Sequence, residues 1–203
     1  MTKINGYEQI YQWQVGKLAN FDLTGNAPSL GLTTDAVGRV KIYFFGRLYL
    51  VDGKGVWPDD GGSAGINHLS LVAHYALSPG RGEPAYDFRP LGRLCGLMEA
   101  QNSLVLQDVA RAMARRFDSD SAALAEQAER IGGCFEGPDP SGGYSWLFHP
   151  FPKVPLRLIW HKADAEFKSD YRLLFDSSST AFMEFEALGF LAGIFVKEIT
   201  GEE

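Results

Sequence analysis

Residues 151–176 read FPKVPLRLIWHKADAEFKSDYRLLFD, and this stretch decides the class of the fold. Apolar side chains occupy every second position from Val154 to Trp160, and a second apolar run follows at residues 171–175. Both runs have the length and residue types of β-strands, and a period of two indicates a strand with one buried face. Pro155 has no backbone N–H, so it confines the first strand to a sheet edge or makes its first residues irregular.

Upstream and downstream of this stretch, the sequence predicts further strands and five helices. Residues 39–51 are rich in β-branched and aromatic side chains and form two strands that meet near Gly46, and residues 144–148 form another strand. Apolar residues at helical spacing predict helices near residues 4–18, 63–77, 106–117, 121–131 and 185–195. Strands and helices come in blocks, which predicts an α+β fold with a mostly antiparallel sheet packed with helices.

The length of the chain, 203 residues, predicts a single domain that spans residues 1–203. Two segments, residues 21–38 and 58–65, are rich in Gly, Asp, Pro, Ser and Thr and are predicted long loops. The helix near residues 4–18 is amphipathic, with a stripe of apolar residues made by Ile4, Tyr7, Ile10, Tyr11, Val15 and Leu18.

The composition excludes several classes of protein. With 19 basic and 25 acidic residues the chain carries a net charge of −6, which argues against a general binder of nucleic acid or of an anionic membrane. No apolar run approaches the roughly 18 residues of a transmembrane helix, and the N-terminal residues do not resemble a signal peptide. We therefore expect a soluble, cytoplasmic protein.

Motifs that would identify a cofactor or metal site are missing from the sequence. There is no phosphate-binding G-x-x-x-x-G-K-[ST] motif, and the four histidines have none of the spacings of a helical zinc site. The two cysteines, Cys95 and Cys134, cannot by themselves form a Cys-only zinc site or a four-thiolate iron–sulfur site. We therefore predict neither a cofactor nor a metal.

Acidic residues gather after the two strands of residues 151–176 and supply the candidate site. In an extended chain, Asp164 and Glu166 would point the same way and could bind a cation or act as an acid–base pair. The same residues, and Asp176 after the second strand, can instead stabilise turns by accepting backbone N–H groups. The candidate ligand-binding residues are Trp160, His161, Asp164, Glu166 and Asp176.

The same stretch resembles a known family. The elements PKVP at residues 152–155, W-x-x-x-D-x-E-F at 160–167 and LFD at 174–176 are similar to the C-terminal signature of domain-of-unknown-function family 3786, a family of bacterial and archaeal proteins. Weaker matches upstream extend the resemblance over about residues 39–196. The sequence departs from the family pattern at Ala163, where the family has glycine, and at Lys168, where it has proline.

The resemblance implies no established activity. Some relatives carry an additional cysteine-rich iron–sulfur domain, which implies a redox context and a protein partner. Because the sequence contains no catalytic constellation and two predicted long loops, we expect a binding or accessory module for a protein partner or a small ligand. The alternative is a metal-assisted or acid–base enzyme that uses Asp164 and Glu166. A third possibility is that Trp160, Phe167 and Phe175 form a core cluster and that the acids only stabilise the turns around it.

Overall fold

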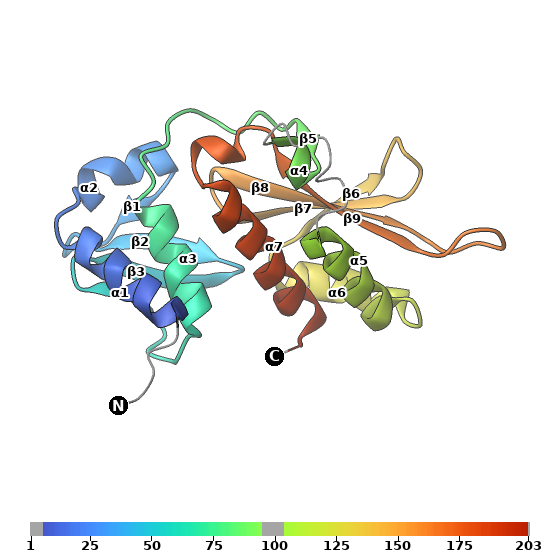
Figure 1. Cartoon of the computed structure of the whole chain (residues 1–203), viewed down its shortest axis with the longest axis horizontal. Helices are drawn as coiled ribbons and strands as arrows, with labels where there is room; N and C mark the ends of the chain where they lie inside the picture. Colours follow the sequence, from blue (N-terminus) through green and yellow to red (C-terminus); the bar gives the residue numbers. More distant parts are fainter. Residues whose placement is uncertain (1–5, 95–103, 203) are drawn as a thin grey trace.

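The computed structural model describes residues 6–94 and 104–202, and Figure 1 shows the arrangement of their helices and strands. Two antiparallel sheets, one from each half of the chain, are each covered by helices. The predicted α+β class is confirmed, and the strands are divided between two sheets. None of the helices in the described ranges has both the length and the apolar character needed to span a membrane.

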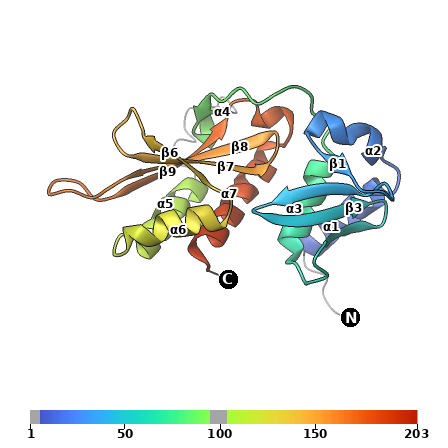
Figure 2. The same cartoon turned by 180° about the vertical axis from the view of Figure 1, so that it is seen from behind.

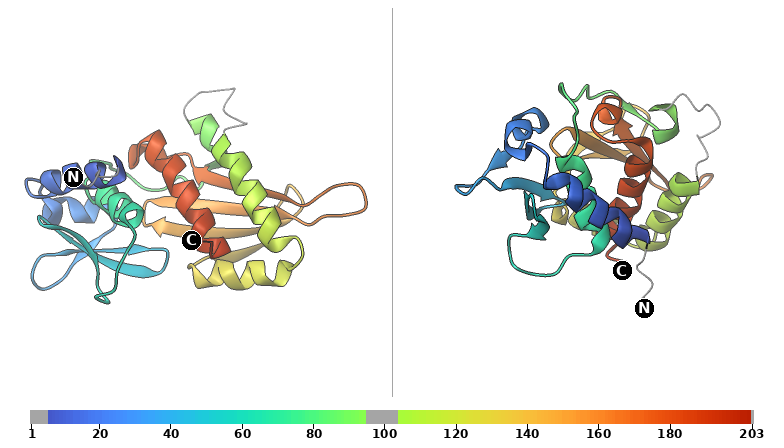
Figure 3. Two further views of the ribbon diagram at one scale, coloured as in Figure 1. Left: turned by 60° about the horizontal axis from the view of Figure 1, so that its bottom comes forward. Right: turned by 60° about the vertical axis from the view of Figure 1, so that its left-hand side comes forward.

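The first half of the chain builds the smaller sheet, in the order β1-β2-β3-β4. Helices α1 and α3 lie side by side next to this sheet, as Figures 1 and 3 show. Its elements are α1 (Gly6–Leu18), α2 (Leu23–Asn26), the 3-10 helix η1 (Ala27–Leu30), β1 (Thr33–Thr34), β2 (Val40–Phe44), β3 (Arg47–Asp52), β4 (Gly55–Pro58) and α3 (Ile66–Ala76).

The predicted hairpin around Gly46 is confirmed. Phe44 pairs with Arg47, so that Phe45 and Gly46 alone form the connection between β2 and β3. Both residues have positive φ, 47° for Phe45 and 80° for Gly46, which matches the twist of a two-residue hairpin turn.

The prediction of a long loop at residues 21–38 is wrong. The segment contains α2, η1 and β1. Asp22 starts α2 by accepting a hydrogen bond from the backbone N–H of Gly25 through its side chain, and Leu30 is fully buried. Local capping and the burial of a few apolar residues therefore order a segment whose composition is that of a loop. In residues 58–65, by contrast, no helix or strand lies between β4 and α3.

The second half builds the larger sheet, in the order β5-β9-β8-β7-β6, with α5, α6 and α7 on one face (Figures 2 and 3). Strand β6 falls where the sequence analysis places no strand. The elements are β5 (Phe88–Arg89), α4 (Leu91–Leu94), α5 (Leu104–Phe117), α6 (Ser121–Arg130), β6 (Cys134–Pro138), β7 (Tyr144–Phe151), β8 (Val154–His161), β9 (Asp170–Asp176), the 3-10 helix η3 (Ser179–Ala181) and α7 (Phe185–Thr200).

Strand β8 is the central strand of this sheet, so the expectation that Pro155 marks an edge strand is wrong. The alternative expectation, that the first residues of the strand are irregular, agrees with the structure. The register with β7 shifts between Phe148 and Phe151, and the pairing with β9 begins only at Leu156. Pro155 therefore lies in the part of β8 where no regular ladder needs its missing N–H.

An aromatic stack joins the two halves. The ring of Phe151 lies between Phe44 and Tyr75, with centroid distances of 4.8 and 4.4 Å. These residues belong to one continuous set of buried apolar side chains that draws on both sheets and on α3 and α7. The core is therefore shared by both halves of the chain.

Candidate functional site

The acidic segment of the family signature forms the turn between β8 and β9, which projects from the right-hand side of the molecule in Figure 1. Asp164 Oδ1 accepts hydrogen bonds from the backbone N–H groups of Glu166 and Phe167, at 2.8 and 2.7 Å. The N–H of Asp164 donates to the carbonyl oxygen of Phe167. These bonds from Phe167 and Glu166 lower the pKa of Asp164. The carboxylate of Asp164 therefore stabilises the turn.

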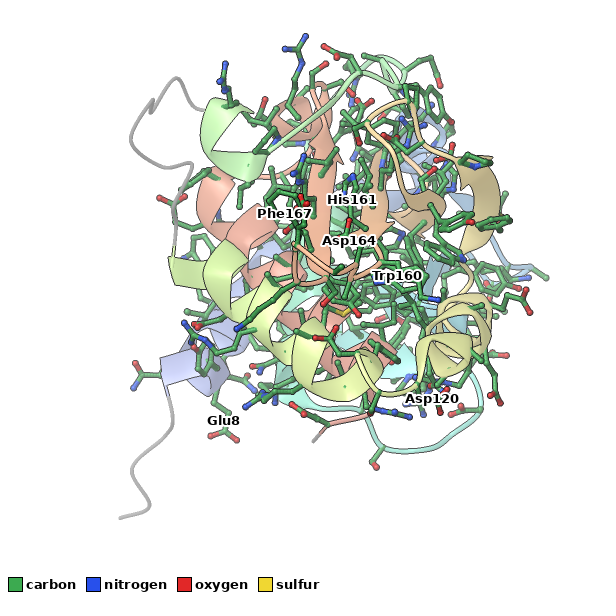
Figure 4. All side chains as sticks on the ribbon, turned by 90° about the vertical axis from the view of Figure 1, so that its right-hand side faces the viewer. Glu8, Asp120, Trp160, His161, Asp164 and Phe167 are labelled. Atoms are coloured by element: carbon green, nitrogen blue, oxygen red, sulfur yellow. The ribbon has the colours of Figure 1, made fainter. Side chains whose placement is uncertain are left out.

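The two acids do not form the extended pair that the sequence suggests. The chain turns between Asp164 and Phe167, and the side chain of Glu166 is exposed. Phe167 is 69% exposed, so it does not join a core cluster with Trp160 and Phe175. Figure 4 shows Trp160, His161, Asp164 and Phe167 at this end of the sheet. Within the described ranges, no group of three or more His, Cys, Asp or Glu side chains could hold a metal ion.

His161 lies near Ser141 and Asp170 at the start of this turn. Its Nε2 lies 3.3 Å from Ser141 Oγ, and its Nδ1 lies 4.0 Å from Asp170 Oδ2. The order hydroxyl, imidazole, carboxylate is that of a nucleophilic triad. The hydroxyl of Ser141, however, donates to Asp139 Oδ1 at 2.5 Å, and the Ser141 N–H donates to the same oxygen. The Ser141 hydroxyl therefore stabilises its own turn.

Trp160 and Asp176 are buried at separate places. Trp160 packs beside Tyr144, with ring centroids 6.1 Å apart. Asp176 ends β9 six residues after Asp170, roughly 20 Å along the strand. Asp176 is fully buried, and its Oδ1 accepts hydrogen bonds from the N–H groups of Ala85 and Ser178 and from the Ser178 hydroxyl. It thus fastens the segment between α3 and β5 to the end of β9.

A cavity that no sequence motif indicates lies between α1, α3, η3 and the start of α7. Its volume is about 680 Å³, within the range of small-molecule sites. Figures 1 and 3 show α1 and α3 side by side, with α7 next to α3. Most of the cavity wall is apolar, and the apolar side chains include Ile10, Trp13, Leu71, Leu77, Phe182 and Phe190.

Two polar side chains in this wall have unused hydrogen-bonding capacity. Gln14 is only 3% exposed, and its Oε1 accepts a hydrogen bond of 2.9 Å from Ser70 Oγ. Its amide nitrogen donates to no residue within 6–94 or 104–202. His74 lies one helical turn beyond Ser70, and no hydrogen bond joins its ring to any described residue. Both side chains line the cavity.

Burial decides the charge state of His74. Desolvation lowers its pKa below the usual 6.5, and the nearby charge of Lys17 lowers it further, while Glu184 acts in the opposite direction. The imidazole is therefore neutral at neutral pH. A neutral imidazole offers one donor and one acceptor nitrogen.

Aromatic side chains of α1 form the rim of the cavity. Tyr7 stacks on Phe190 with ring centroids 5.5 Å apart, and Trp13 is 60% exposed under the ammonium group of Lys17, which lies 3.7 Å from the ring centroid. Ile10 is also exposed. Tyr7 and Ile10 belong to the apolar stripe that the sequence predicts for this helix, so part of the stripe lines the cavity instead of the closed core.

One sequence signal could have located the cavity. Gln14 follows Tyr11 by three residues and precedes Leu18 by four, so it occupies a position of the buried stripe of α1. A polar residue at such a position needs a partner. Neither Ser70 nor the cavity could be identified from spacing, because α1 and α3 are far apart in the sequence.

No curated protein and no solved structure matches this chain. The family model described as "Domain of unknown function (DUF3786)" matches residues 22–198, a range that includes both sheets, α3 and most of α7. The match spans most of the chain and contains the signature of residues 152–176, and the protein therefore belongs to the DUF3786 family.

Proposed function

We propose that this protein is a binding module and that a small, largely apolar molecule occupies the cavity between α1, α3, η3 and α7. The observation that carries the proposal is the side chain of Gln14, which is buried in the cavity wall with an amide nitrogen that donates no hydrogen bond to the described residues. The Gln14 side chain lines the cavity, so a ligand that enters it can accept a hydrogen bond from this amide nitrogen.

The shape and composition of the cavity support the same proposal. It lies where helices of both halves meet, and junctions between structural units are common places for ligand sites. The exposed aromatic side chains Tyr7 and Trp13 enlarge its apolar surface at the entrance.

The proposal of an enzyme that uses Asp164 and Glu166 has less support. One carboxylate oxygen of Asp164 already accepts two backbone N–H groups, and Glu166 is exposed to solvent. A proton-transferring pair needs both carboxylates within reach of one substrate atom.

The expectation of a cytoplasmic protein is kept as part of the proposal. Cys134 is a free, exposed thiol on the edge strand β6. Such thiols persist in reducing compartments, where disulfides are rare.

The test is a titration with N-phenyl-1-naphthylamine, a neutral fluorophore that brightens in apolar surroundings. We expect saturable binding to the wild-type protein. Ala187→Trp places an indole ring in the cavity wall and should abolish that binding, whereas Ala122→Trp, on the exposed face of α6, should not. Equal binding by both variants, or no binding by the wild-type protein, would overturn the proposal.

A further inference from the structure

The polar groups of the cavity also specify the head group of its ligand, an inference that rests on the proposed function. Gln14 and His74 are polar side chains of the wall with hydrogen-bonding groups that no described residue engages, and Gln14 is only 3% exposed. Their positions, charge states and neighbours can be compared with the requirements of neutral, anionic and cationic head groups.

Gln14 and His74 are held close to one another. Ser70 and His74 lie four residues apart on α3, so their side chains occupy one face of the helix, about 5–6 Å apart at Cβ. The hydroxyl of Ser70 holds the amide of Gln14 through the hydrogen bond to Oε1. Gln14 and His74 therefore both line the cavity, and Ser70, which holds the Gln14 amide, lies one helical turn before His74.

These two groups are complementary to an uncharged head group that both accepts and donates. The N–H of the Gln14 amide can donate to an acceptor, and the unprotonated ring nitrogen of the neutral His74 can accept a hydrogen bond from a donor on the same ligand. A primary carboxamide provides both, with a carbonyl oxygen for Gln14 and an N–H for His74.

The charges around the cavity act against an anionic head group. The charged side chains in the wall are Lys17, Glu184 and Glu186, and Lys17 is already placed over the ring of Trp13. Two carboxylates against one ammonium group leave the wall with a net negative charge. A carboxylate beside Gln14 and a neutral His74 would be desolvated without a cationic partner, which is unfavourable.

A cationic head group fits the deep part of the cavity no better. An ammonium group only donates, so the N–H of Gln14 would remain without an acceptor. The carboxylates of Glu184 and Glu186, which could pair with a cation, lie near the start of α7. Gln14, by contrast, is on α1 and buried.

We propose that the cavity selects molecules with an apolar body and an uncharged, carboxamide-like head group, which is held by Gln14 and His74.

The experiment compares three molecules with the same eight-carbon chain: octanamide, octanoate and octylammonium. Each is titrated against the wild-type protein loaded with N-phenyl-1-naphthylamine, at neutral pH. We expect octanamide to displace the fluorophore at a concentration about tenfold lower than either charged molecule, since an unpaired buried polar or charged group costs on the order of one factor of ten in affinity.

Matched variants assign this preference to Gln14. The double substitution Gln14→Met, Ser70→Ala removes both partners of the buried hydrogen bond and keeps the helix and the shape of the wall. We expect it to lose the preference for octanamide, so that the three molecules compete equally. Gln12→Met, at an exposed position of α1, should keep the preference.

The outcomes separate the two proposals. If the fluorophore binds but the three molecules displace it equally, or if the preference persists in the Gln14 and Ser70 double variant, the assignment of the head group is wrong and the ligand cavity stands. If neither the fluorophore nor any of the three molecules binds, the proposed function is wrong and this inference fails with it.

Discussion

The phenol ring of Tyr75 stacks on the ring of Phe151 at a centroid distance of 4.4 Å and an interplanar angle of 12°, so that α3 and the β7–β8 hairpin share one aromatic contact. The hydroxyl of Tyr75 donates to the carbonyl oxygen of Leu30 at 2.7 Å and accepts from the N–H of Lys153 at 3.1 Å. One buried side chain thus joins η1, α3 and the turn between β7 and β8, which contains Lys153.

The hydroxyl group of Tyr75 should contribute to the stability of the fold. Tyr75→Phe keeps the stack but leaves the buried C=O of Leu30 and the N–H of Lys153 without their partner, at a cost of about 2 kcal/mol. In a chain of this size the melting temperature should fall by roughly 4–8 °C. Tyr43→Phe, at an exposed position of β2, is the control and should leave the melting temperature unchanged. An equal effect of both substitutions would contradict the structural role of Tyr75.

Asp176 should be required for stability. Asp176→Ala removes the acceptor of three hydrogen bonds at a fully buried position and should lower the free energy of unfolding by about 3 kcal/mol. Asp176→Asn keeps an acceptor oxygen and should cost less. Urea unfolding measures both, with Asp87→Ala as the control because that side chain pairs with Arg89 at the surface. If Asp176→Ala were as stable as the wild-type protein, Asp176 would not hold the segment between α3 and β5 to the end of β9.

Asp164 and Glu166 should differ in their effect on stability. Asp164→Ala removes the acceptor of the two N–H groups in the β8–β9 turn, so it should lower the melting temperature. Glu166→Ala should leave the midpoint unchanged, because that side chain is exposed outside the turn's hydrogen bonds. The two single variants and the double variant are compared by thermal unfolding. If the effect of Glu166→Ala equals that of Asp164→Ala, the two acids act together and a shared site should be considered.

Glu198 on α7 should make the free energy of unfolding depend on pH. His68 Nε2 lies 2.8 Å from Glu198 Oε1, and this hydrogen bond, with the charges of His68, Arg130 and Arg47, lowers the pKa of Glu198 below the usual 4.5 against the opposing effect of burial. Because the folded-state pKa is lower than the unfolded-state value, the stabilisation is complete above about pH 4.5 and is lost as the pH falls through the folded-state pKa.

The measurement for Glu198 is the difference in unfolding free energy between the wild-type protein and Glu198→Gln. We expect about 1 kcal/mol near pH 6 for this half-buried pair, shrinking toward zero as the pH approaches about 3. Glu129→Gln, on the exposed surface of α6, is the matched control. A difference that grows toward low pH would contradict the assigned direction.

Local pattern was sufficient to predict most elements of the fold. The strands β7, β8 and β9, the hairpin at Gly46 and helix α7 all have periodic apolar residues or turn residues in a short window, and these signals act between near neighbours in the chain. The ordered part of residues 21–38 has no periodic pattern of apolar residues, because a helix cap and a few buried side chains order it. Pro155 is tolerated in the central strand β8 because the register with β7 shifts there, and the sequence does not display that shift.

The candidate sites show the same difference between features that depend on neighbouring residues and features that depend on tertiary contacts. The α+β class, the family signature and the acids of the β8–β9 turn could be predicted from residues close together in the chain. Three features depend on the folded arrangement: Asp164 closes a turn, Asp176 is buried roughly a strand's length away, and Gln14, Ser70 and His74 face one cavity. Packing of α1 against α3 and α7 brings those three side chains together, and no local pattern contains that contact.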